Sequence, residues 1–465
     1  MNTTVVSALI AKLTAGCGLV LLLPLLTALF GEEPVLPFIY SMALCFLLSA
    51  FLRYKGKKKV INLNPRDGLA VTALSWICIS ILYLFPYFLS GLLSPLDALV
   101  ESISGLTGTG ATVFSDLTVL PKSILFFRSL THWLGGLGII VIFVALFPQA
   151  GKGSARMIDA ESTGPYSSRA VPRIKEMAKA LFAVYLLFTV SAALIYTLLG
   201  MNFFDAVNHA FSTIATGGFS TKNESIAFYD STPLKLSLIH ISIRVLWENT
   251  EFKVYLSIVA AATILISLNL MLESGLYAPS ALLEALFTSA SLSSTTGFIS
   301  YDFEAWPHFS QVILLILMFI GGCGGSPSGG LKVTRIILLF KSMTAVLRRK
   351  LHPQAVIQTR AGGENFSESM LLEVFCFFFI YTMSIFLWTA LIAASGADIP
   401  SALGLSIATM SNSGPALGQF GATCNWSAMP AMTKMVVALS MLMGRLESFT
   451  LLILFLPSFW RKNGW

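Results

Sequence analysis

Four short glycine turns, each set between long apolar runs, constrain the fold of this chain more than any other feature of its sequence. The first is the segment 106–112, which reads LTGTGAT, and related turns fall at 214–219, 294–298 and 411–416. In each of them a Ser or Thr is followed by a glycine, and each lies just after a short helix-like segment. We read the chain as a scaffold that brings these four turns around one axis.

The apolar runs place the turns in a lipid bilayer. The 465 residues are 55% hydrophobic and 11% charged, whereas a soluble domain carries about 25% charged residues. Since a span needs about 20 apolar residues, we expect spans near 5–30, 35–52, 67–91, 123–148, 178–200, 253–273, from 309, 370–395 and 431–458. Basic residues gather in the loops between these runs, which is the positive-inside pattern. The net charge of +7 therefore indicates membrane topology and not nucleic-acid binding.

The spans and turns form a unit that repeats four times, as a span, a shorter helix, a glycine turn and a second span. The shorter helices are expected at 95–106, 203–214, 280–293 and 400–411. The basic loops then fall on one side of the membrane and the four turns on the other. The predicted fold is an all-α polytopic membrane protein, with an N-terminal two-helix region (1–60) and pore units at 61–150, 151–250, 251–350 and 351–465.

The turns suit a cation. Irregular backbone at membrane depth is tolerated only where protein buries it or where it lines a watery cavity, so four such turns predict a shared cavity. Three of the short helices begin with an acid, at Asp97, Asp205 and Glu284, which suits a helix N-terminus and leaves the partially negative C-terminus pointing inward. Glycine lets successive carbonyls face one axis, and rings of carbonyls replace the hydration shell of K⁺ in selective filters.

With one key glycine in each of four units, the chain resembles the Trk/Ktr/HKT superfamily of K⁺ transporters over nearly its whole length. The resemblance implies K⁺ uptake across the bacterial inner membrane, a homodimer and a cytosolic nucleotide-binding regulatory ring of the TrkA type. It implies K⁺ as the transported ion, with H⁺ or Na⁺ as candidate coupled ions, and no covalent cofactor. The filter residues that it implies are Gly108, Thr109, Gly110, Ala215, Thr216, Gly217, Thr295, Thr296, Gly297, Asn412, Ser413 and Gly414.

A second glycine-rich stretch interrupts the second span of unit three. Six glycines and a proline within 321–330 cannot continue a stable helix. The bland interpretation is a broken helix end near the cytoplasmic face. The resemblance implies instead an intramembrane loop that gates the path below the filter. The glycines concerned are Gly321, Gly322, Gly324, Gly325, Gly329 and Gly330.

Arg445 lies in the middle of the last predicted span. A charge at that depth is costly and marks a functional candidate. An ion pair with Glu447 or another acid, or snorkelling, is the structural alternative. The resemblance places Arg445 in the path below the filter, as an electrostatic barrier or gate partner.

Other chemistry is weakly represented. The six cysteines show no metal-ligand spacing, and the glycines near 108 lack the context of a dinucleotide loop. His132, His209 and Asp205 are read as structural residues and not as a catalytic relay. The sequence shows no nucleophilic triad or pair of carboxylates, so we do not predict an enzyme.

One interval is short. The key glycines are separated by 107, 80 and 117 residues. The stretch 234–247, where unit two needs its second span, reaches only about 21 Å as a helix, against a hydrocarbon core of about 30 Å. A real internal deletion, a functional variant and a sequencing artefact are all open, since 236–241 resembles the translation of a transposon-end adaptor. The alternatives to K⁺ uptake are a secondary transporter for another small cation or solute and a non-functional, internally deleted copy.

Overall fold

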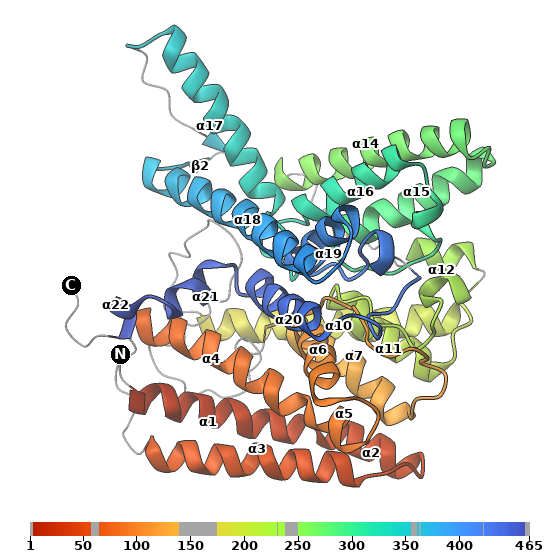
Figure 1. Ribbon diagram of the computed structural model, residues 1–465, viewed down its shortest axis with the longest axis vertical. Coiled ribbons are helices and arrows are strands. Elements are labelled where there is room, and N and C mark those ends of the chain that lie inside the picture. The colour runs from red at the N-terminus through yellow and green to blue at the C-terminus, as the bar shows by residue number, and fades with distance from the viewer. Residues whose placement is uncertain are drawn as a thin grey trace.

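The computed structural model describes residues 3–56, 65–138, 174–229, 231–237, 250–354, 360–361, 364–421 and 423–460. Within these ranges the regular secondary structure is helical (Figure 1), except for one antiparallel pair formed by β1 (Arg360–Ala361) and β2 (Glu364–Asn365). Six of the described helical segments are long and apolar enough to cross a membrane. The predicted all-α polytopic fold is confirmed.

The N-terminal region packs along one edge of the molecule. Helix α1 (Thr3–Val20) continues into α2 (Leu22–Phe30), and α3 (Leu36–Lys55) returns beside α1, as the bottom of Figure 1 shows. The expected span at 5–30 is present but divided at Leu21, because Pro24 has no N–H to bond to the preceding turn. Buried side chains join α1 and α3 to α4 (Pro65–Tyr83) in one hydrophobic core.

Units one and two follow the predicted order. After α4 come α5 (Phe85–Leu89), the short helix α6 (Pro95–Thr107) and α7 (Lys122–Gly136). The end of the expected 123–148 span lies outside the described residues. Unit two contains α10 (Ile174–Leu198), the short helix α11 (Phe203–Ile214), the 3₁₀ turn η2 (Ser225–Phe228) and α12 (Thr232–Ser237). Residues 238–249, which make up most of the short stretch where unit two needs its second span, also lie outside the described part of the chain.

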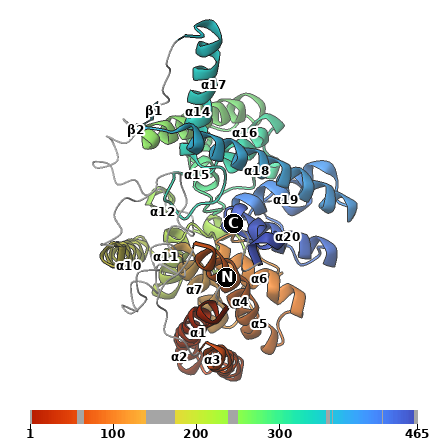
Figure 2. The ribbon, with the colours of Figure 1, turned by 90° about the vertical axis from the view of Figure 1, so that its left-hand side faces the viewer.

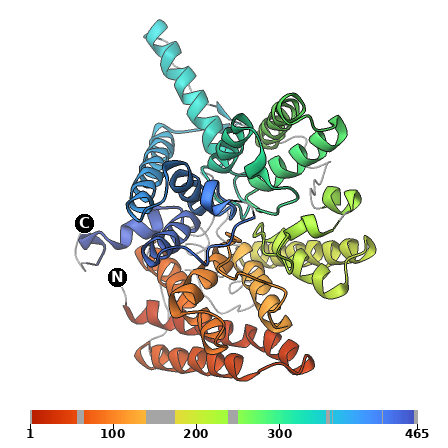
Figure 3. The same cartoon turned by 45° about the vertical axis from the view of Figure 1, so that its right-hand side comes forward.

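Units three and four are described almost completely. Unit three contains α14 (Thr250–Glu273), the short helix α15 (Ala278–Ser293), η3 (Phe303–Ala305), α16 (His308–Ile320) and α17 (Val333–Leu351). Unit four contains α18 (Glu368–Ala394), the short helix α19 (Ile399–Ser411), η4 (Gly418–Phe420), α20 (Ala431–Arg445), α21 (Phe449–Leu454) and α22 (Pro457–Trp460). Helix α17 projects from the body (Figure 2), and the four units surround a common centre (Figure 3).

The last span differs from the prediction. We expected one helix over 431–458, but α20 ends at Arg445. Glu447 and Ser448 both have positive φ, at 50° and 40°, and such backbone cannot continue a right-handed helix. Arg445 therefore lies at a helix end and not inside a continuous span.

The short helices are fixed at their N-termini by side-chain caps. The side chains of Ser94, Asn202 and Asp398 accept hydrogen bonds from backbone amides in the first turns of α6, α11 and α19. These caps satisfy N–H groups that have no partner within the helix. Capping gives three of the four short helices a defined starting point, and hence a defined depth for the turn that follows.

Candidate functional site

The four glycine turns share one backbone conformation. In each, a residue in the left-handed region comes two positions before a glycine with φ between 74° and 88°. The left-handed residues are Gly108, Thr216, Thr295 and Asn412, and the glycines are Gly110, Gly218, Gly297 and Gly414. The amide between them donates to a carbonyl five residues earlier on the short helix, at 2.8–3.0 Å in all four turns.

This repeat corrects the register of the second turn. We expected Gly217 to match Gly110, Gly297 and Gly414, but Gly218 does so, and Gly217 matches Thr109, Thr296 and Ser413. The amide of Gly217 is the one that donates to the short helix, to Ser212 at 2.8 Å. The sequence contained the signal: Gly218 lies 13 residues after Asp205, the same interval that separates Asp97 from Gly110.

The turns contact one another in a closed ring. A Cβ atom added to Gly110 would overlap the carbonyl oxygen of Gly217 in the second turn. In the same way, Gly218 meets the Thr296 carbonyl and Gly297 meets the Ser413 carbonyl. Gly414 closes the ring against the Thr109 carbonyl of the first turn. Positive φ and close backbone contact together require glycine at these four positions.

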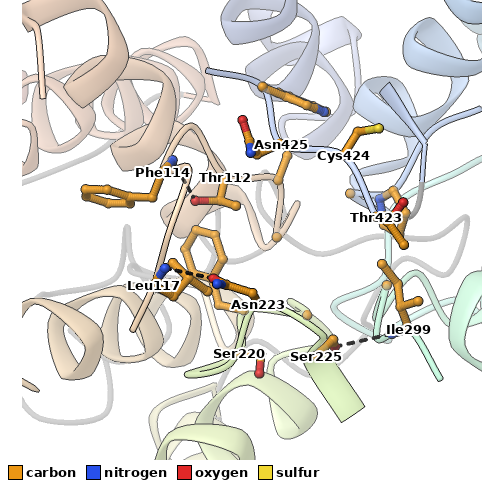
Figure 4. Close-up of a pocket in the computed structure, with 18 of the residues that line it drawn as sticks. Thr112, Phe114, Leu117, Ser220, Asn223, Ser225, Ile299, Thr423, Cys424 and Asn425 are labelled. Carbon is orange, nitrogen blue, oxygen red and sulfur yellow. Dashed lines mark hydrogen bonds between the residues drawn. The ribbon is translucent and has the colours of Figure 1, made fainter. Parts of the chain in front are cut away.

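A cavity of about 120 Å³ opens beside this ring, which is room for several water molecules. All four units contribute to its lining (Figure 4), and the dashed bond between Leu117 and Asn223 joins the first unit to the second at 2.7 Å. Ser225 and Ile299 link the second unit to the third at 3.3 Å. Residues from all four repeats therefore line one cavity beside the glycines.

The acids that the sequence analysis expected at the starts of the short helices bind protein partners. Asp97 pairs with Lys434 at 2.5 Å, and Asp205 accepts from Thr221 at 2.7 Å. Glu284 pairs with Lys235 at 2.7 Å. These carboxylates tie the short helices to neighbouring segments. Asp97 and Asp205 lie in the first turns of α6 and α11 as expected, but Glu284 does not, because α15 begins earlier, at Ala278.

A buried ion pair that the sequence analysis missed supports the first turn. Glu101 accepts from Arg128 Nε at 2.7 Å, and both side chains are almost completely buried. Glu101 also accepts from the Val113 amide, just after the turn, at 2.9 Å. The Arg128 guanidinium lies 4.1 Å from the centre of the Phe219 ring in the second turn. One charged pair thus braces two neighbouring turns.

The glycine-rich stretch forms a loop between α16 and α17, beneath the third and fourth turns. The Gly329 amide donates to Thr295 Oγ1 at 3.1 Å, and a Cβ at Gly329 would overlap the Ser411 carbonyl. A Cβ at Gly321 would likewise overlap the Gly329 carbonyl, so the loop folds back on itself. Glu251 of α14 accepts from the Gly324 amide at 2.6 Å. The remaining loop glycines, Gly322, Gly325 and Gly330, lie in the same segment.

Arg445 connects this loop to unit one. Its guanidinium donates to the carbonyls of Pro327 in the loop and Gly135 at the end of α7. Glu447, the ion partner considered for Arg445, instead pairs with Arg335 at 2.6 Å. The structure thus brings Arg445 and the glycine loop together on one side of the turn ring.

The two histidines considered as relay residues are buried. His209 lies near the Asp205 carbonyl at 2.8 Å and Ser220 Oγ at 3.0 Å. His132 lies near the Gly105 carbonyl at 2.6 Å and stacks on Phe219 with centroids 4.0 Å apart. Both pack between elements, in keeping with structural roles.

Comparisons with known proteins agree with this architecture. The family model described as TrkH, a cation transport protein, matches residues 37–278 and 274–462. The Trk system potassium uptake protein TrkH of Halomonas elongata is 37% identical over 459 residues, covering 94% of this chain and 95% of the relative. TrkH of Escherichia coli K12 is 37% identical over 449 residues, covering 91% and 92%.

A solved structure is also similar. The crystal structure of the potassium transporter TrkH from Vibrio parahaemolyticus superimposes with a TM-score of 0.88 at 34% identity, covering 99% of this chain and all of that one. Similarity in sequence and in fold extends over nearly the full length of both this chain and its relatives. The chain is a multi-pass membrane protein that belongs to the TrkH family of cation transport proteins.

Proposed function

We propose that this protein carries K⁺ into the cell across the bacterial inner membrane, through the ring of glycine turns. The observation that carries the proposal is the closed contact of four turns, each glycine against a carbonyl of the next turn. Backbone carbonyls around one axis can replace the water shell of a cation. The relatives named above are potassium uptake proteins, and the membrane potential supplies about 2.3 kcal/mol per elementary charge at 100 mV.

The filter is proposed to consist of three successive residues from each turn, in the corrected register. The K⁺-binding ring then draws on the carbonyls of Thr109, Gly217, Thr296 and Ser413. The flanking positions are Gly108 and Gly110, Thr216 and Gly218, Thr295 and Gly297, and Asn412 and Gly414. Ala215, included in the expected set, falls one position earlier in this register.

Below the filter, the loop after Ile320 is proposed to act as a gate, with Arg445 holding it. The support is the set of contacts from Gly329 to the third and fourth turns and from Arg445 to Pro327. A mobile gate must rest against the path it closes, and this loop touches two of the four turns. A positive charge at the same level would also raise the barrier to cations.

Assembly is proposed to follow the family pattern, with a homodimer and a cytosolic nucleotide-binding ring of the TrkA type. Helix α17 offers a surface for such contacts, since it carries Arg348, Arg349 and Lys350 in its last turn and exposes Phe340 and Leu347 on its sides. A membrane enzyme is not proposed, because no described cluster offers reactive chemistry. A secondary transporter for another solute is less well supported, because such folds use inverted repeats and these units run in parallel.

Ion flux into liposomes tests the proposal. In liposomes that contain the purified protein, an outward-directed K⁺ gradient should drive uptake of ⁸⁶Rb⁺. External K⁺ should compete with that uptake far better than external Na⁺ does. Empty liposomes give the baseline. Equal competition by Na⁺ would reject K⁺ selectivity. No uptake above the baseline by a correctly folded protein would reject K⁺ transport itself.

A further inference from the structure

The four glycine turns form the four walls of the ring, and one wall is supported differently from the other three. Behind three of them, a hydroxyl on the residue before the glycine pairs with a hydroxyl two positions earlier. These pairs are Thr107 with Thr109 at 2.7 Å, Ser294 with Thr296 at 2.8 Å, and Ser411 with Ser413 at 3.1 Å. The second wall has Ala215 and Gly217 at these positions, so neither hydroxyl exists.

His132 of α7 occupies the space that this absence leaves. The three atoms nearest to a Cβ built on Gly217 all belong to the His132 ring, with Nε2 at 2.8 Å and two ring carbons closer still. Gly217 is not among the residues with positive φ, so its backbone would accept a side chain. The imidazole of His132, and not backbone conformation, is what requires glycine at 217.

The ring of His132 is held firmly in this place. Its side chain is fully buried, and Nδ1 lies 2.6 Å from the Gly105 carbonyl on α6. A carbonyl only accepts hydrogen bonds, so Nδ1 carries the proton. The ring also stacks on Phe219 with centroids 4.0 Å apart. The imidazole thus joins the first short helix to the turn of the second wall.

From this geometry we infer that His132 is a positioning residue for ion selection, which replaces the missing hydroxyl pair and sets the position of the Gly217 carbonyl in the ring. The inference rests on the proposed K⁺ transport, because it assigns His132 to the same ring. A ring that discriminates between ions must hold its ligands within about 0.5 Å. Three walls meet that demand with their own hydroxyls, and the second wall meets it with a side chain from unit one.

A double-mutant cycle between His132 and Gly217 tests this inference. His132→Ala should loosen the second wall and lower the K⁺/Na⁺ flux ratio by about tenfold, equivalent to about 1.4 kcal/mol of discrimination. Gly217→Ser alone should reduce K⁺ flux by at least about tenfold, because its Cβ meets the imidazole. The double variant removes the imidazole that obstructs the new side chain, so its K⁺ flux should exceed that of Gly217→Ser by at least about threefold.

Controls separate this role from general stability and from the proposed function. Leu130→Ala removes a buried side chain of α7 that belongs to the hydrophobic core shared with the N-terminal helices, so it should lower Tm while keeping the wild-type flux ratio. An unchanged K⁺/Na⁺ flux ratio in His132→Ala would overturn the inference. So would a K⁺ flux in the double variant that is no higher than in Gly217→Ser. If the wild type itself carries no selective K⁺ flux, the proposed function fails. The same cycle measured by thermal unfolding still tests the contact, because independent sites would show additive losses.

Discussion

Glu101 and Arg128 form the least exposed ion pair among the described residues, at 0% and 1% side-chain exposure. Removing one partner leaves the other charge buried and uncompensated. We expect Arg128→Leu to lower the free energy of unfolding by about 3–5 kcal/mol, which thermal unfolding in detergent would measure. The matched control is Arg349→Leu, whose pair with Glu368 is 3.7 Å long and exposed; it should cost about 0–1 kcal/mol. Equal losses for the two variants would contradict a bracing role for Arg128.

A second prediction at the scale of single residues tests the corrected register. Gly218→Ala places a methyl group against the Thr296 carbonyl at φ 77°. Gly91→Ala introduces the same backbone strain at φ 72°, but nothing lies within 4 Å of its Cβ. Each substitution should lower the free energy of unfolding by about 1–2 kcal/mol through backbone strain. Only Gly218→Ala should also abolish K⁺ flux. Liposome flux that is equally affected in both variants would show that strain, and not the ring contact, limits transport.

At the scale of elements, the loop between α16 and α17 is held by Arg445, and flux measurements can separate the charge of Arg445 from its cross-link. Arg445→Ala removes the bonds to Pro327 and Gly135 and one positive charge near the path, so we expect faster K⁺ flux, by about tenfold if the barrier falls by about 1.4 kcal/mol. Arg445→Lys keeps the charge but loses the planar fork of donors. A rise in both variants would assign the effect to the cross-link, and a rise in Arg445→Ala alone would assign it to the charge. Wild-type flux in both variants, or loss of flux in folded Arg445→Ala, contradicts the gate.

The elements also show how far sequence reasoning reaches. Apolar runs and glycine turns predicted the helices and the four short segments closely, because burial in lipid leaves a strong signal in composition and period. The end of the last span's helix at Arg445 was not predicted, because Glu447 and Ser448 adopt positive φ without any residue type in the sequence that indicates it. The ion pair between Glu101 and Arg128 was not predicted, because the fold and not the local spacing brings these two residues together. The shift from Gly217 to Gly218 was not predicted because Gly217 follows Thr216 and so fits the Ser/Thr–Gly pattern, whereas Gly218 follows a glycine.

At the scale of the whole molecule, a native cysteine reports which side of the membrane the turns face. Cys424 is exposed and lines the cavity beside the glycine ring, with Thr423 and Asn425 (Figure 4). A charged, membrane-impermeant thiol reagent added from outside should therefore react at Cys424 and block K⁺ flux. Reagent confined to the inside should not block flux through this residue. Cys424→Ser is the control and should abolish the block, whereas block from the inside alone would invert the proposed topology.

The closed ring of turns has a consequence for how such a protein changes over generations. In a channel assembled from four identical subunits, every mutation in the filter strikes all four quadrants at once. Here one polypeptide supplies every quadrant, so a codon change alters a single quarter of the ring. The second wall, with Gly217 and its imidazole support in place of paired hydroxyls, is what such freedom permits. If the ring selects the ion, as proposed, selectivity can be adjusted in quarter steps, each tested by selection while the other three quadrants keep working.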